Sequence, residues 1–101
     1  MSNNVFVKSG RVSDLLTTDT TATGDWKFKD APKAAIQVVA TAAATVVFEV
    51  SNDGTNAIAT TLGTVTLAAA GSDGFTTDAP WKYIRARVTA NSGTVTVTMS
   101  V

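Results

Sequence analysis

Polar and apolar residues alternate through most of the last quarter of this 101-residue chain. A period of two is typical of a β-strand with one buried face, and the break at Asn91-Ser92-Gly93 divides the pattern into two strands. The expected inward residues are Ile84, Ala86, Val88, Val95, Val97, Met99 and Val101. The expected outward residues are Tyr83, Arg85, Arg87, Thr89, Thr94, Thr96, Thr98 and Ser100. The segment therefore predicts a hairpin of two half-buried strands.

The same pattern occurs earlier in the chain. Asp30-Ala-Pro32 precedes alternating apolar residues at 36, 38 and 40, just as Asp78-Ala-Pro80 precedes those at 84, 86 and 88. Each segment is followed by a second alternating one, at residues 45–50 and 94–99. We interpret this as an internal duplication of a hairpin, with a chance match as the alternative. Two hairpins that are each apolar on one face bury those faces as two sheets packed about 10 Å apart.

The composition argues against several classes of function. The chain has no cysteine and no histidine, so it offers no disulfide, no thiol nucleophile and none of the most common zinc ligands. Its eight Lys and Arg residues are scattered and are balanced by eight Asp and Glu residues, which argues against a nucleic-acid partner. The longest weakly polar run, residues 34–50, contains Gln37 and Glu49 and is too polar for a membrane span. We expect one soluble domain without a secretory signal.

No group of residues predicts catalysis. Most carboxylates lie in or beside predicted turns, where aspartate commonly accepts main-chain hydrogen bonds. The serines have no histidine to activate them, and no Ser-x-x-Lys spacing occurs. The turns at Asn52-Asp53-Gly54 and Ser72-Asp73-Gly74 lack the spaced carboxylates of a calcium loop. We therefore expect no enzyme, no metal site and no cofactor.

The remaining segments supply further strands and turns. Residues 25–30 alternate, and this places Trp26 and Phe28 in the core with the neighbouring lysines opposite. Turns are expected at residues 51–56 and 71–74, on either side of a strand within residues 58–67. These features predict an all-β fold of seven or eight strands, arranged as a single antiparallel β-sandwich over residues 15–101.

Residues 1–14 do not share the pattern of the sandwich, and we expect them to form an N-terminal arm. The arm contains an apolar segment, Val5, Phe6 and Val7, between polar neighbours. Two arrangements are open. The segment adds a short strand to the edge of a neighbouring subunit, or it pairs with an edge of its own sandwich. In the first case it is a candidate for contact with a partner.

The other candidates for partner contact are Trp81, Tyr83, Arg85 and Arg87, of which the last three share one face of a strand. Trp81 and Tyr83, with Trp26, are also the residues that could build a platform for stacking on a sugar. The alternative interpretations are that the tryptophans pack in or against the core and that the arginines are simply solvated.

Four segments of the chain, taken in their order and spacing, resemble those of a known class of proteins. They are Phe48-Glu-Val-Ser-Asn-Asp-Gly54, Thr61-Leu-Gly-Thr-Val-Thr-Leu67, Ala79-Pro-Trp-Lys-Tyr-Ile-Arg-Ala-Arg-Val-Thr89 and Ser92-Gly-Thr-Val-Thr-Val-Thr98. Together they resemble small virion proteins of tailed bacteriophages, over roughly residues 24–101. The pattern concerns folding residues and transfers no catalytic site. The resemblance implies a β-sandwich that is often jelly-roll-like.

The resemblance also implies a function, which we state as an expectation. The favoured one is a phage capsid decoration or cement protein that stabilises the head shell. A tail or head fibre, or a carbohydrate-binding sandwich for host recognition, is the first alternative, and a tail or head-to-tail connector component is the second. The expected partners are the major capsid protein or other virion proteins and further copies of the chain, with no nucleic acid and no membrane. The expected location is the virion, after synthesis in the host bacterial cytoplasm.

Overall fold

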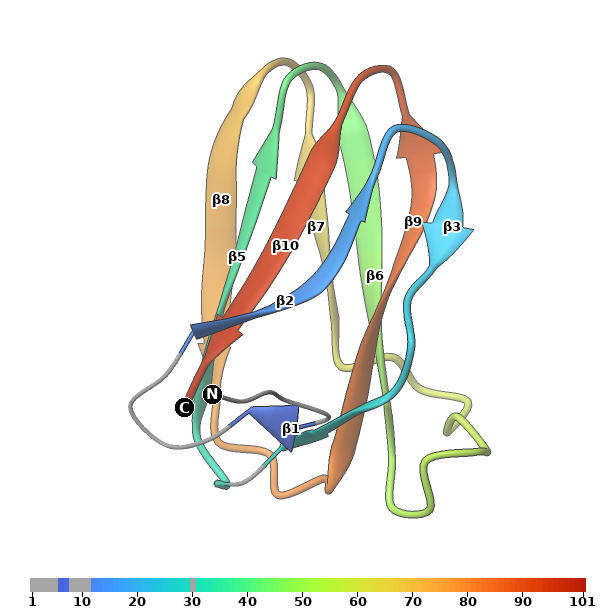
Figure 1. Ribbon diagram of the computed structural model, residues 1–101, viewed down its shortest axis with the longest axis vertical. Helices are drawn as coiled ribbons and strands as arrows, with labels where there is room; N and C mark the ends of the chain where they lie inside the picture. The colour runs from blue at the N-terminus through green and yellow to red at the C-terminus, as the bar shows by residue number, and fades with distance from the viewer. Residues whose placement is uncertain (1–5, 8–11, 30) are drawn as a thin grey trace.

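The computed structural model describes residues 6, 7, 12–29 and 31–101, and this part of the chain contains strands and loops but no helix. The strands are β1 (Phe6–Val7), β2 (Val12–Thr18), β3 (Ala22–Thr23), β4 (Lys27–Lys29), β5 (Ala34–Ala40), β6 (Ala44–Ser51), β7 (Gly63–Leu67), β8 (Gly71–Thr77), β9 (Tyr83–Asn91) and β10 (Val95–Ser100). They form two sheets that pack against each other (Figure 1). The predicted all-β sandwich is confirmed.

The two sheets have the strand order of a jelly roll. The β10 sheet runs β2-β10-β5-β8, and the β9 sheet runs β1-β4-β9-β6-β7, with β3 also paired to β9. β3 and β4 pair with successive parts of β9 and so act as one interrupted strand. With β3 and β4 counted as one strand, each connection between β2 and β10 crosses from one sheet to the other, except the connection from β6 to β7. Eight main strands arranged in this way make a jelly roll, to which β1 is added at one edge.

The predicted hairpins are wrong. β5 and β6 lie in different sheets, as do β9 and β10, so each duplicated unit crosses over the core instead of folding back in one sheet. β5 pairs with β10 and β6 pairs with β9, in both cases antiparallel. Alternation in the sequence specifies an inward face for each strand, and a hairpin within one sheet and a crossing between two sheets both satisfy it. The strands of the two similar segments therefore exchange partners, and each segment makes a crossing at the same end of the sandwich.

The two crossings are bonded to each other. Thr41 donates its main-chain N–H to the carbonyl of Thr94 at 3.0 Å, and Ser92 donates to the carbonyl of Ala43 at 3.0 Å. Gly93 lies so close to Thr41 and Ala42 that a Cβ at this position would clash with them. A glycine is therefore required where the second crossing passes the first.

The core lies between the sheets and consists of the predicted inward faces. The residues below one-tenth exposure include Ile36, Val38, Val46, Phe48, Val50, Ile84, Ala86, Val88, Val95, Val97 and Met99. Phe48 is fully buried and meets Phe75 edge to face, with ring centroids 5.3 Å apart. Phe48 lies on β6 and Phe75 on β8, so this aromatic pair joins the two sheets.

The predicted phase of β4 is reversed. Lys29 is buried at 3% exposure, whereas Phe28 lies opposite Tyr83 on the outer face. The physical reason is that each side chain has a suitable partner in this orientation. The Lys29 ammonium reaches three main-chain carbonyls, and the Phe28 ring meets Tyr83 edge to face at 5.4 Å between centroids. Alternation alone therefore assigned the wrong face to the core.

The loops confirm one predicted turn and correct another. Residues 51–56 form a turn in which Gly54 has a φ of 70°, a conformation that favours glycine. Asp53 accepts hydrogen bonds there from the main-chain N–H groups of Thr55 and Asn56, both at 2.8 Å. Residues 71–74, predicted as a turn, instead begin β8, which pairs along β5 over its whole length.

The N-terminal residues are described in part. β2 begins at Val12, so residues 12–14, which the sequence pattern assigned to the arm, belong to the sandwich. Phe6 and Val7 form β1, which pairs in parallel with β4 of the same chain. This corresponds to the second of the two arrangements that the sequence left open. Val5 lies outside the described residues.

Candidate functional site: two outer sheet faces

The outer face of the β9 sheet carries two arginines that share one carboxylate. Arg85 Nε lies 2.7 Å from Glu49 Oε1, and Arg87 Nε lies 3.3 Å from Glu49 Oε2. Strand pairing explains the contact, because β6 and β9 are neighbours and Glu49 lies directly opposite Arg85. The Trp26 ring lies under the Arg85 guanidinium, 4.4 Å from its centroid. We call this group, Trp26, Glu49, Arg85 and Arg87, the arginine face.

The two arginines are not equally satisfied. Arg85 donates a hydrogen bond to Glu49 and stacks on Trp26, and its side chain is 25% exposed. The Arg87 side chain is 41% exposed, and its Nε atom is buried without a hydrogen bond, since its approach to Glu49 is only an ion pair. The cluster of two cations and one anion has an excess positive charge, and Arg87 is its more available member.

Beside Arg87 the surface is hollowed between β3 and β9, which lie next to each other in Figure 1. The hollow measures about 390 Å³ and is lined by Thr21, Ala22, Thr23, Arg87, Val88 and Thr89. Thr23 lies opposite Arg87 in the strand register, so both side chains are on the outer face. The hollow therefore combines a guanidinium with threonine hydroxyls.

The aromatic candidates each contact a different neighbour. Tyr83 meets Phe28 and lies over Gly54, where a Cβ would be only 3.2 Å from its ring. Trp26 stacks on Arg85, and Trp81 packs against the core. In the part of the chain that the structure describes, ring-to-ring contacts join Phe28 to Tyr83 and Phe48 to Phe75. Ring contacts thus do not link the three residues proposed for a sugar platform.

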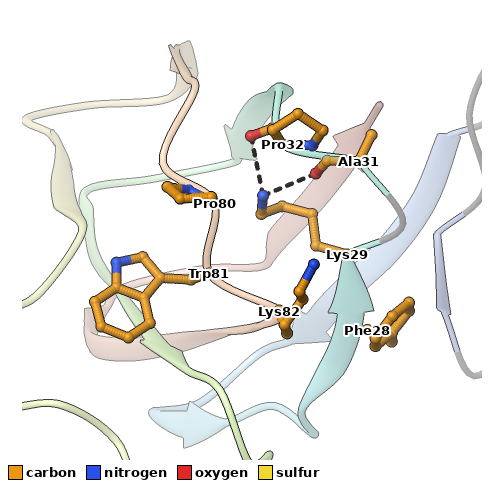
Figure 2. Close-up of a pocket in the computed structure, with 7 residues that line it drawn as sticks. All are labelled: Phe28, Lys29, Ala31, Pro32, Pro80, Trp81 and Lys82. Carbon is orange, nitrogen blue, oxygen red and sulfur yellow. Dashed lines mark hydrogen bonds between the residues drawn. The ribbon is translucent and has the colours of Figure 1, made fainter.

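Trp81 lines a pocket at the end of the sandwich, shown in Figure 2. The pocket measures about 270 Å³, and its walls are Phe28, Lys29, Ala31, Pro32, Pro80, Trp81 and Lys82. Lys29 Nζ donates to the carbonyls of Ala31 at 2.8 Å, Pro32 at 3.0 Å and Ala79 at 2.8 Å. These bonds match the three N–H groups of an ammonium, so Lys29 acts as a structural brace.

The charge of Lys29 is held in an unfavourable environment. Burial is the larger cause that lowers its pKa from 10.5, and the nearby charge of Lys82 adds to it. The three carbonyls come from both Asp-Ala-Pro segments, Ala31 and Pro32 from the first and Ala79 from the second. Lys29 therefore ties together the two Asp-Ala-Pro segments.

The outer face of the β10 sheet has a different character. Its outward residues, by strand register, are Val12, Asp14, Thr17, Ala35, Gln37, Val39, Ser72, Gly74, Thr76, Thr96, Thr98 and Ser100. We call this surface the threonine face. Asp14 is its single charged residue, and Val12 and Val39 are large hydrophobic residues exposed at 69% and 45%. Gln37 donates a hydrogen bond to Ser72 across it at 2.9 Å.

The structure brings some of the predicted contact residues together. Tyr83, Arg85 and Arg87 follow one another on the outer face of β9, as predicted, whereas Trp81 lies in the preceding loop against the core. Phe6 and Val7 are in β1. The sequence interpretation missed Glu49 and Lys29, whose partners are set by strand pairing and by loop carbonyls. The sequence pattern can indicate only whether each of these side chains points outward or inward. It does not predict which residue the side chain contacts.

Two further features concern the part of the chain that the structure describes. No group of three or more Asp, Glu, His or Cys side chains in that part of the chain is placed to hold a metal ion. Within the same residues, no helix has the length and apolar character needed to cross a membrane.

Comparisons with known proteins give little further information. No family model matches the chain, and no curated protein matches it. A protein from a study of Bacillus endospore appendages, described as a novel family of disulfide-linked pili, aligns over 97% of this chain and 96% of its own. The identity is 19% and the TM-score is 0.37. A likeness of this size carries no conclusion about function.

Proposed function

We propose that this chain is a structural protein of a bacteriophage virion, a head decoration or cement protein that stabilises the capsid shell. The observation that carries the proposal is the threonine face, together with the sequence resemblance to small virion proteins. The face covers the outer side of the β10 sheet and has Asp14 as its single charged residue. Interface centres are depleted in charged residues in the same way.

The physical argument concerns the cost of removing this face from water. A threonine can keep a hydrogen bond to a partner through its hydroxyl while its methyl group is buried, whereas a buried charge needs an opposite charge beside it. Exposed Val12 and Val39 add apolar area that a partner would cover. The partners that we propose for this face are the major capsid protein, or another virion protein, and further copies of the chain.

A fibre, carbohydrate-binding or connector role remains the alternative, and the number of copies per virion separates these roles. Quantitative mass spectrometry of virions purified from cells that express the gene would measure it. Hundreds of copies per particle are expected for a cement protein. A count that matches one trimer or one small ring would replace this proposal with a fibre or connector role, and absence from the particles would refute a virion role.

The threonine face itself is tested by a charge placed at its centre. Thr98→Arg puts a cation on the central strand β10 and is expected to abolish binding to virion heads and self-association, measured by sedimentation. Thr64→Arg is the matched control, because Thr64 is exposed on the outer face of the other sheet. If Thr98→Arg binds and sediments as the parent protein does, the threonine face is not the contact surface.

A further inference from the structure

The hollow between β3 and β9 has features of a binding site for an anion. Arg87 lies at its wall, is the more exposed of the two arginines, and shares the Glu49 carboxylate with Arg85. The ion pair with Glu49 is made by the Arg87 Nε atom, and the two terminal nitrogens of a guanidinium carry its other four N–H groups. This end of a guanidinium is the part that binds a carboxylate with two parallel hydrogen bonds.

The support behind Arg87 is rigid. It lies on β9, which is paired to β6 on one side and to β3 and β4 on the other, in the middle of the sheet. Arg85 is fixed beside it by Glu49 and by the Trp26 ring. The strands and side chains around Arg87 are therefore already ordered, and the conformational entropy lost on binding is mainly that of the Arg87 side chain itself.

We propose that this hollow binds the carboxylate of an acidic sugar residue, such as a hexuronic acid, with Arg87 holding the carboxylate and the threonines holding the ring hydroxyls. Thr21, Thr23 and Thr89 line the hollow, and each hydroxyl can donate and accept a hydrogen bond. This inference goes beyond the proposed virion role and does not depend on it.

A sugar fits the hollow better than an acidic protein side chain does. The hollow has a volume of about 390 Å³ and is shallow and open to solvent, so a sugar ring can lie in it against the sheet. A single aspartate or glutamate would use the guanidinium but leave most of the hollow and its threonines without a partner. A sugar acid carries its carboxylate next to several hydroxyls, which is the combination that the lining groups match.

The direct test is a titration of the 15N-labelled protein, in which NMR spectra record the shifts of the main-chain amide signals. The probe is D-glucuronate, with D-glucose as its neutral counterpart and N-acetylglutamate as the protein-like carboxylate. We expect D-glucuronate to give saturable shifts at residues 21–23 and 87–89, and the other two compounds to bind at least about tenfold more weakly.

Variants show whether Arg87 is responsible. Arg87→Gln is expected to weaken D-glucuronate binding by about tenfold or more, and Arg87→Lys to restore it in part, because lysine keeps the charge but not the planar pair of donors. Lys33→Gln is the control, since Lys33 is an exposed cation outside the hollow. The spectrum of each free variant reports whether the fold is kept.

Four results would overturn the proposal. They are the absence of saturable shifts with D-glucuronate, equal binding of D-glucose, undiminished binding by Arg87→Gln, and binding of N-acetylglutamate as tight as that of D-glucuronate. The last result would instead assign the hollow to an acidic side chain of a protein partner.

Discussion

Lys29 is a buried cation whose described partners are main-chain carbonyls and not a carboxylate. Burying a charge is costly unless hydrogen bonds replace its hydration, and three carbonyls within 3.0 Å provide that replacement. The same hydrogen bonds provide a donor for three carbonyls that lie in loops, outside the strand pairing of the sheets. A single side chain therefore holds the residues that precede β5 and β9.

The first prediction is that Lys29→Met lowers the free energy of unfolding by about 1–3 kcal/mol, because methionine has a similar length but leaves the three carbonyls without a donor. Chemical denaturation measures the change. Lys33→Met, four residues along the same segment and exposed, is the control and is expected to change stability by less than about 0.5 kcal/mol. Equal effects of the two substitutions would show that the brace does not stabilise the fold.

The second prediction concerns Asp53 and acid. Hydrogen bonds from the main chain and side chain of Asn56, then from Ser51 and Thr55, hold the pKa of Asp53 well below its ordinary value of 3.8. The stabilisation from this carboxylate is therefore fully present above pH 3.8 and is lost as the pH falls through the lower pKa of the folded state.

Asp53→Asn is therefore expected to lower stability at neutral pH and to make the remaining stability fall less steeply below pH 3.8. Thermal melts over a series of acidic pH values measure both effects. Asp19→Asn, at another exposed aspartate, is the control. A variant with the same slope as the parent protein in acid would remove Asp53 from the explanation.

The strands show what an alternating sequence can and cannot predict. The inward residues of β5, β6, β9 and β10 could be predicted because each strand repeats its phase over several residues. β4 is only three residues long, and its predicted phase was wrong because the hydrogen bonds that Lys29 donates to three carbonyls outweigh simple hydrophobicity. The arginine face was only partly predictable, since the contact between Glu49 and Arg85 depends on which strands are neighbours.

The third prediction tests packing between the strands of opposite sheets. Phe48→Ala is expected to lower the free energy of unfolding by about 3–5 kcal/mol, because Phe48 is fully buried on β6 and contacts Phe75 on β8. Val39→Ala, at an exposed position of β5, is the control and is expected to have a small effect. Urea denaturation that places the two variants within a few tenths of a kcal/mol of each other would contradict this core.

At the scale of the whole molecule, the two similar units, residues 30–50 and 78–99, are joined by exchange of strands. If each unit were a separate hairpin, the two units would meet only through their apolar faces and would share no strand pairing. Here β5 pairs with β10, β6 pairs with β9, and each unit contributes one strand to each sheet. Because neither unit completes a sheet alone, we expect the domain to unfold as one cooperative body.

The last prediction distinguishes this topology from the hairpins that the sequence pattern favoured. The natural chain has no cysteine, so an introduced pair has no competing thiol. Gln37 and Thr98 are opposite each other in the β5 and β10 register, at the roughly 4.5–5.5 Å between Cα atoms that antiparallel neighbours have. That separation lies within the range that a disulfide spans, about 4.4–6.8 Å. Gln37→Cys with Thr98→Cys is therefore expected to form an intramolecular disulfide on mild oxidation.

Arg87→Cys with Thr98→Cys is the control pair, because a hairpin of residues 83–100 with Ser92 and Gly93 in its turn would place these two side chains opposite each other on one surface. In the observed fold they point outward from different sheets, which pack about 10 Å apart, so their thiols cannot meet. Mass spectrometry of alkylated protein measures both pairs, at a concentration low enough to suppress dimers. A disulfide in the control pair and none in the Gln37 and Thr98 pair would restore the hairpins. A disulfide in the Gln37 and Thr98 pair and none in the control pair would show that the chain crosses the core between β9 and β10.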